Sequence, residues 1–105
     1  MLFAKKEMDV AAAKRFWAWF EEQEGWMIEN LRSHGMDVVW AIDAQIKPVF
    51  PYFKKELEFQ LGFNNGKGEF FFFHFGDKHL IRDAETLANL MPETLKDRWT
   101  FIAER

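Results

Sequence analysis

The chain of 105 residues contains no cysteine, and this absence excludes disulfide bonds, thiolate nucleophiles and cysteine-ligated metal centres together. Serine occurs once, at Ser33, directly before His34 and Gly35, and the end of a helix explains these three residues better than a catalytic triad does. No apolar run approaches the roughly 20 residues that a membrane span requires. We therefore expect no cofactor and no membrane partner.

The chain also lacks an excess of positive charge. Fourteen Lys and Arg residues oppose seventeen Asp and Glu residues, which gives a formal net charge of −3. Because no basic field would attract phosphate groups, we expect no nucleic-acid partner. Charged residues begin at Lys5, too early for the apolar segment of a signal peptide, and a chain without cysteine suits a reducing compartment. These observations favour a cytoplasmic protein.

Aromatic residues, in contrast, are abundant: thirteen Phe, five Trp and one Tyr make up 18% of the chain. Each one removes roughly 150–250 Å² from water when it is fully buried. Apolar residues make up 49% of the chain and charged residues 30%, a composition typical of a globular domain. The length predicts a single domain over residues 1–105, with residues 1–8 as a flexible or strand-forming segment.

Two helices are predicted in the first half of the chain. Asp9 is a suitable N-cap for a helix that begins at Val10. The core-facing stripe of this helix consists of Phe16, Phe20, Met27 and Leu31. Gly25 is a point where the helix could bend or divide, and Gly35 fits a C-terminal cap with positive φ.

The second helix is expected to begin at Asp37, which would cap it. Val38, Val39, Ile42 and Ile46 share one face of this helix, and Pro48 ends the regular pattern.

The second half of the chain predicts strands. Leu57, Phe59, Leu61 and Phe63 alternate with more polar residues, as in a half-buried strand. The loop of residues 64–68 then predicts a β-hairpin, and residues 69–75 form its second strand, which is apolar at both parities. Asp83 is the expected N-cap of a short helix that ends before Pro92, and a last strand follows in which Trp99, Phe101 and Ala103 share one face.

The order of elements is therefore α-α-β-β-α-β. Since each helix needs one apolar face to bury, we expect an α+β domain of two layers, with a three-stranded, mainly antiparallel sheet and a short crossover helix. The simplest crossover places the last strand beside the first, in the order 2-1-3.

The residues Phe16-Trp17-x-Trp19-Phe20, the turn Gly76-Asp77, and Leu90-Met91-Pro92 followed by Trp99-Thr100-Phe101 give the chain a family resemblance. It resembles a loose group of small, uncharacterised bacterial α+β domains. The resemblance covers nearly the whole chain and implies no active site. It implies instead a partner of a larger protein or an immunity-type protein.

One group of side chains is a candidate metal site. His74, Asp77 and His79 lie within six residues and could in principle ligate zinc, but the helical spacing that brings two histidines together and a fourth ligand are missing. We expect a solvated histidine at a strand end instead, and neither a metal site nor a catalytic residue.

Some apolar residues have no predicted place in the core. Trp40 lies opposite the Val38 face of its helix, Trp17 lies at the edge of its stripe, and one parity of the second strand must face away from the core, as must Ile102. Other parts of the monomer could cover these residues. Otherwise they form an interface to a protein partner or a second copy, with the following candidate residues: Trp17, Trp40, Phe70, Phe72, His74 and Ile102.

We therefore expect a non-enzymatic protein–protein interaction or immunity-type module. The alternative is a small-ligand-binding protein or enzyme with an aromatic pocket between helices and sheet, in which His74 or Arg98 makes the polar contact.

Overall fold

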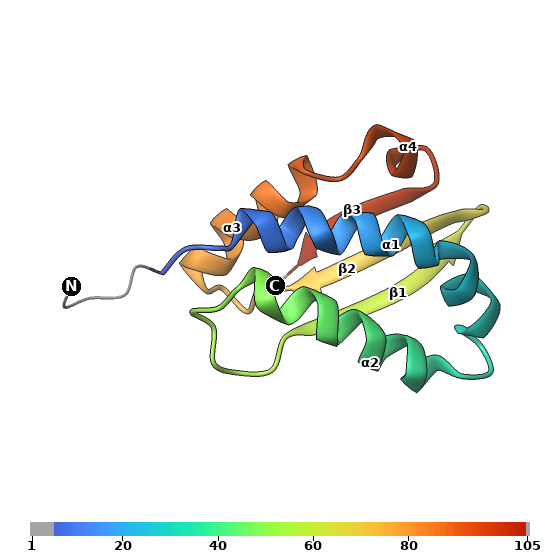
Figure 1. Cartoon of the computed structure of the whole chain (residues 1–105), viewed down its shortest axis with the longest axis horizontal. Coiled ribbons are helices and arrows are strands. Elements are labelled where there is room, and N and C mark those ends of the chain that lie inside the picture. Colours follow the sequence, from blue (N-terminus) through green and yellow to red (C-terminus); the bar gives the residue numbers. More distant parts are fainter. Residues whose placement is uncertain (1–5, 105) are drawn as a thin grey trace.

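The computed structural model describes residues 6–104 (Figure 1). Residues 1–5, most of the segment that was expected to be flexible or strand-forming, lie outside the described part. The elements in chain order are α1 (Val10–Asn30), α2 (Gly35–Ile46), the 3₁₀ turn η1 (Lys47–Val49), β1 (Glu58–Asn64), β2 (Lys67–Phe73), α3 (Lys78–Asn89), α4 (Glu93–Lys96) and β3 (Trp99–Glu104). This is the predicted α+β order, with the one-turn helix α4 in addition. No helix within residues 6–104 is both long and apolar enough to cross a membrane.

The first helix begins where the sequence predicts. The Asp9 carboxylate accepts a hydrogen bond from the Ala12 amide at 3.0 Å, which satisfies one of the free N–H groups of the first turn. The helix continues through Gly25 as a single element. Phe16, Phe20 and Met27 are buried, so the predicted stripe is the face that packs on the sheet.

The starts of the next two helices differ from the prediction. The second helix begins at Gly35, which has no positive φ, and Asp37 lies in its first turn, where a carboxylate is favourable beside the helix N-terminus.

The third helix begins at Lys78, because the Asp77 carboxylate accepts from the amides of His79 and Leu80. The predicted cap, Asp83, therefore lies inside this helix.

The hairpin forms as predicted. Its two-residue turn, Asn65-Gly66, has φ values of 56° and 78°, as a type I′ turn requires. β1 and β2 pair antiparallel, with Phe59 opposite Phe72 and Leu61 opposite Phe70.

The last strand pairs with β2 and not with β1, so the predicted strand order 2-1-3 is wrong. β3 runs parallel to β2, which makes the sheet mixed with the order β1-β2-β3. The physical reason lies in β2, whose run of four Phe residues is apolar at both parities and suits the central position. Phe70 lies beside Leu61 on one side and Phe101 on the other. This order leaves β1 at an edge of the sheet.

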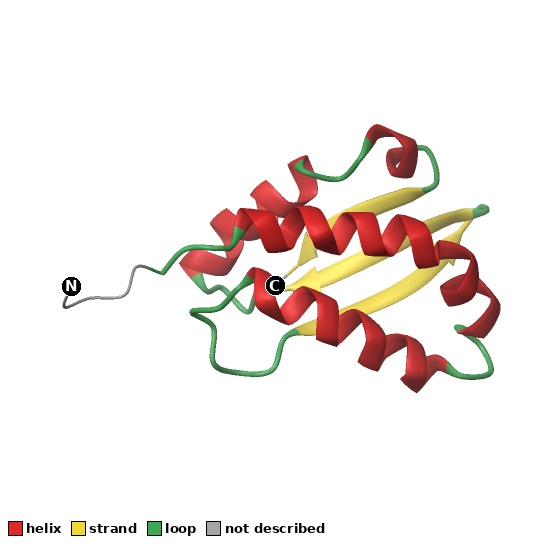
Figure 2. Cartoon of the chain, in the orientation of Figure 1, coloured by secondary structure: helices red, strands yellow, loops and turns green. Residues whose placement is uncertain are grey.

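The helices cover one face of the sheet. Buried residues of α1, α2, α3 and α4 join a single core with Phe70 and Phe72, while the intervening Phe71 and Phe73 are outside this core and half-buried. Figure 2 shows α1 running in front of the strands, and Figure 1 shows α2 beside β1. The other face carries Phe71, Phe73 and Ile102, and the register places these three side chains together.

Candidate functional site

The free edge of β1 adjoins a groove that is lined mostly by apolar side chains. Three neighbouring hollows make up this groove: the first is lined by Ile28, Leu31, Arg32 and Phe63; the second by Leu31, Gly35, Met36, Val39, Phe59, Gln60 and Leu61; the third by Val39, Trp40, Asp43, Glu56, Leu57, Glu58 and Phe59. Leu31 belongs to the first two hollows, and Val39 and Phe59 belong to the last two. The hollows are therefore continuous, and we call them together the β1 groove.

The β1 groove gathers much of the exposed apolar surface. Among the described residues, eight large apolar side chains are exposed, and four of them line this groove: Ile28 at 46%, Met36 at 58%, Trp40 at 63% and Phe63 at 47%. Single exposed apolar residues are common on any protein, but a contiguous apolar patch commonly marks a binding surface. Trp40 and Phe63 supply the aromatic side chains that interfaces favour.

Three of the six predicted interface residues are not on the surface. Trp17, Phe70 and Phe72 are each at most 1% exposed, so other parts of the monomer cover them, which is the first of the two alternatives that the sequence leaves open. The Trp17 indole N–H donates to the Leu87 carbonyl at 2.8 Å, which gives this ring a buried polar partner on α3. Phe70 and Phe72 occupy the core parity of β2, and Phe71 and Phe73 take the outer parity instead.

The other three predicted residues do not form one site. Trp40 is exposed in the β1 groove, and Ile102 is half-buried on the outer face of the sheet. His74 follows the end of β2, where its Nδ1 accepts a hydrogen bond from the Gly76 amide at 3.0 Å. That bond holds the turn before α3, in which Phe75 has a φ of 51° and is 65% exposed.

The structure supports neither a zinc site at His74, Asp77 and His79 nor a ligand pocket between the helices and the sheet. Asp77 is engaged as the cap of α3, and residues 6–104 contain no cluster of three metal-ligating side chains. Between the helices and the sheet, the ring centroids of Phe16, Phe20 and Phe70 lie 5.9–6.2 Å from one another, so side chains fill the place of the expected pocket. His74 and Arg98, the expected polar contacts of a ligand, lie at opposite ends of the sheet because β2 and β3 are parallel.

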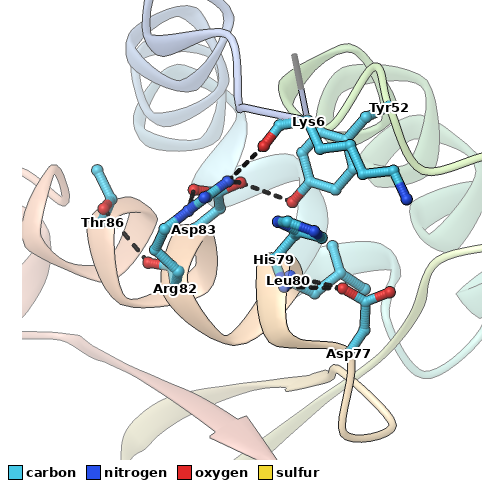
Figure 3. A network of polar contacts seen from close by, with 8 residues as sticks. All are labelled: Lys6, Tyr52, Asp77, His79, Leu80, Arg82, Asp83 and Thr86. Atoms are coloured by element: carbon cyan, nitrogen blue, oxygen red, sulfur yellow. Dashed lines mark hydrogen bonds and ion pairs between the residues drawn. The ribbon is translucent and has the colours of Figure 1, made fainter. Parts of the chain in front are cut away.

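A polar network joins α3 to the segment after η1 (Figure 3). The buried Asp83 carboxylate accepts from the Tyr52 hydroxyl at 2.6 Å and from two nitrogens of Arg82 at 2.9 and 3.0 Å. Burial opposes ionisation, but the hydrogen bonds from Arg82 and Tyr52 outweigh it and hold the pKa of Asp83 below its usual value. Burial and the neighbouring carboxylate raise the pKa of Tyr52. Neither group is poised to exchange a proton near neutral pH.

A second polar cluster joins α1 to β3. The Glu24 carboxylate accepts from Arg98 at 2.9–3.1 Å and from the Trp99 indole at 2.8 Å. The hydrogen bonds from Arg98 lower the pKa of Glu24. Every buried side-chain polar atom within residues 6–104 has a hydrogen-bond partner. The two clusters link elements that are far apart in the sequence and so stabilise the fold.

Sequence reasoning found Trp40 but missed the rest of the β1 groove. Met36 lies just before the predicted start of the second helix, so the helical pattern gives it no place. Strand periodicity places Phe63 on the core face of its strand. Phe63 is exposed because β1 is an edge strand, which local sequence does not show. No protein-family model, no curated protein and no solved structure matches the chain.

Proposed function

We propose that the chain is a non-catalytic protein-binding module that docks another polypeptide in its β1 groove. The observation that carries the proposal is the gathering of Ile28, Met36, Trp40 and Phe63 along one strand edge. A continuous groove of this composition offers several apolar anchor points to a partner chain.

The polar groups support the same function. The pairs Asp83–Arg82 and Glu24–Arg98 are both engaged in hydrogen bonds that link elements of the fold, and neither lines the β1 groove. The carboxylates that do line the groove, Asp43, Glu56 and Glu58, are charged groups that a polypeptide partner can pair with. An immunity-type role, in which the partner is a toxin, is one form of this function.

The proposal is tested by photo-crosslinking in the cells that produce the protein. A photoreactive phenylalanine replaces Trp40 in one variant and Ile81, an exposed residue of α3 that does not line the groove, in the matched control. We expect position 40 to give a discrete covalent adduct with a polypeptide that mass spectrometry identifies, and position 81 to give none. Absence of an adduct at position 40, or equal yields of the same adduct from both positions, would contradict the proposal.

A further inference from the structure

We infer that the polypeptide bound in the β1 groove is a second copy of this chain, which pairs its own β1 antiparallel with the first about a two-fold axis at Leu61. The inference rests on the proposed binding function and names its partner. The resulting sheet would have six strands, with the two β1 strands at its centre.

The β1 edge lacks the features by which proteins block pairing. Edge strands are commonly protected by lysine, proline, bulges or inward charges. β1 contains none of these: its seven residues, EFQLGFN, pair with β2 in an unbroken register, and its single charged residue, Glu58, stands at its start. No strand of the described chain pairs with its other side.

The free hydrogen-bonding groups of this edge belong to Phe59, Leu61 and Phe63. In a two-residue hairpin the pair that flanks the turn is hydrogen-bonded, and such pairs recur at every second residue. The Gly68 amide donates to the Arg98 carbonyl at 2.8 Å, so it points toward β3 and away from its β1 neighbour, Phe63. Along β1, the alternate residues Phe59, Leu61 and Phe63 therefore direct their backbone groups outward.

An antiparallel pairing centred on Leu61 uses these three residues together. It places Leu61 opposite its own copy and Phe59 opposite Phe63 of the second copy, so that all the outward backbone groups are paired. On the outer face, Glu58 meets Asn64 and Gln60 meets Gly62 of the second copy. No like charges meet, and the helix-facing side of the seam is apolar along its length.

The charges along the β1 groove are complementary under the same two-fold axis. Arg32 lies at the Phe63 end of the groove, whereas Asp43, Glu56 and Glu58 lie at the other end. Lys47 approaches Asp43 only to 4.0 Å, at an exposed position. Because antiparallel pairing brings opposite ends together, the Arg32 end of each copy meets the acidic end of the other. This polarity favours a second copy in this one orientation.

The β1 groove presents large side chains to a second copy. The β1 groove runs the length of a seven-residue strand and includes α2 side chains as large as Met36 and Trp40, both more than half exposed.

The test uses position 61, which faces its own copy only in this arrangement. Leu61→Lys and Leu61→Glu are purified separately, and the mass of each full chain is measured by sedimentation equilibrium alone and in an equimolar mixture. Ile81→Lys and Ile81→Glu serve as controls. We expect the wild-type protein and the controls to reach twice the 12.6 kDa of one chain. Each Leu61 variant alone is expected to dissociate at least about tenfold more readily, since like charges then meet at the axis. The mixture is expected to recover a dimer with one chain of each kind.

A milder variant covers the case in which a charge at the half-buried position 61 prevents folding. The chain has no cysteine, so Leu61→Cys can form a disulfide only with a second copy. Residues opposite each other in such a pair have Cα atoms about 5.5 Å apart, within the range of a disulfide. We expect Leu61→Cys to form a covalent dimer under mild oxidation much faster than Ile81→Cys.

A wild-type protein that stays monomeric up to about 1 mM would overturn the second-copy inference. So would a mixture that stays monomeric, or equal oxidation rates at positions 61 and 81. These failures are distinguishable from failure of the proposed function, because an adduct at position 40 with a different protein would leave the binding function in place.

Discussion

Replacement of Trp17 with alanine is expected to lower the free energy of unfolding by about 3–5 kcal/mol. The indole is buried between α1 and α3, contacts the rings of Phe16, Phe20 and Phe101 at 4.9–5.9 Å, and donates a buried hydrogen bond to the Leu87 carbonyl. Truncation leaves a cavity and removes one of the two hydrogen bonds to the Leu87 carbonyl, which still accepts from the Leu90 amide at 3.2 Å. Because small domains have about 5–15 kcal/mol of stability in total, the variant should be close to unfolding.

Trp40→Ala is the matched control. Trp40 is 63% exposed in the monomer, so at protein concentrations low enough to keep the chain monomeric its truncation should change the free energy of unfolding by no more than about 0.5 kcal/mol. Urea titrations followed by far-ultraviolet circular dichroism measure both variants. The sequence pattern treats the two tryptophans alike, as surface candidates, and equal stability of the two variants would show that Trp17 is not a core residue.

Gly68→Ala is the second large effect, with an expected loss of about 1–3 kcal/mol or more from overpacking. A Cβ atom at this position would lie 2.5–2.7 Å from three atoms of the Trp99 ring. The ring cannot move away easily, because it packs on Phe20 at 5.0 Å and its N–H donates to Glu24. The backbone of β2 would have to shift at the position where it pairs with β3.

Gly62→Ala provides the control for this substitution. Gly62 lies on the neighbouring strand, and a Cβ there meets no atom within 4 Å. We expect its midpoint of thermal unfolding to stay near the wild-type value, while that of Gly68→Ala falls by several degrees. Similar midpoints for the two variants would mean that the close packing of Trp99 on β2 is not as the structure shows.

Much of the fold follows from local sequence signals. Asp9 is predictable as a cap because a capping side chain precedes an apolar stripe, and the Asn65-Gly66 turn is predictable because positive φ values suit those residues. The third helix illustrates the limit. Asp77 and Asp83 are both chemically suited to cap a helix. The tertiary structure decides between them, because the Asp83 carboxylate accepts hydrogen bonds from Tyr52 and Arg82.

The surface was harder to predict than the fold. In β2 the run of four Phe residues has no polar alternation, so periodicity could not tell that Phe70 and Phe72 face the helices while Phe71 and Phe73 face away. The role of β1 depends on strand order. The predicted order places β3 beside β1, so that β1 has no free edge and Phe63 has a covering neighbour. In the structure this edge is free and Phe63 is exposed.

The measurement that tests the central claim most directly is amide hydrogen exchange of the wild-type chain at increasing protein concentration. If a second copy pairs with β1, the amides of Phe59, Leu61 and Phe63 gain protection between about 10 µM and about 1 mM, a range that includes the dissociation constants of weak and moderate dimers. The amides of Gln60 and Gly62, which face β2, should be protected throughout. Exchange at the three outward amides that does not change with concentration would contradict the account.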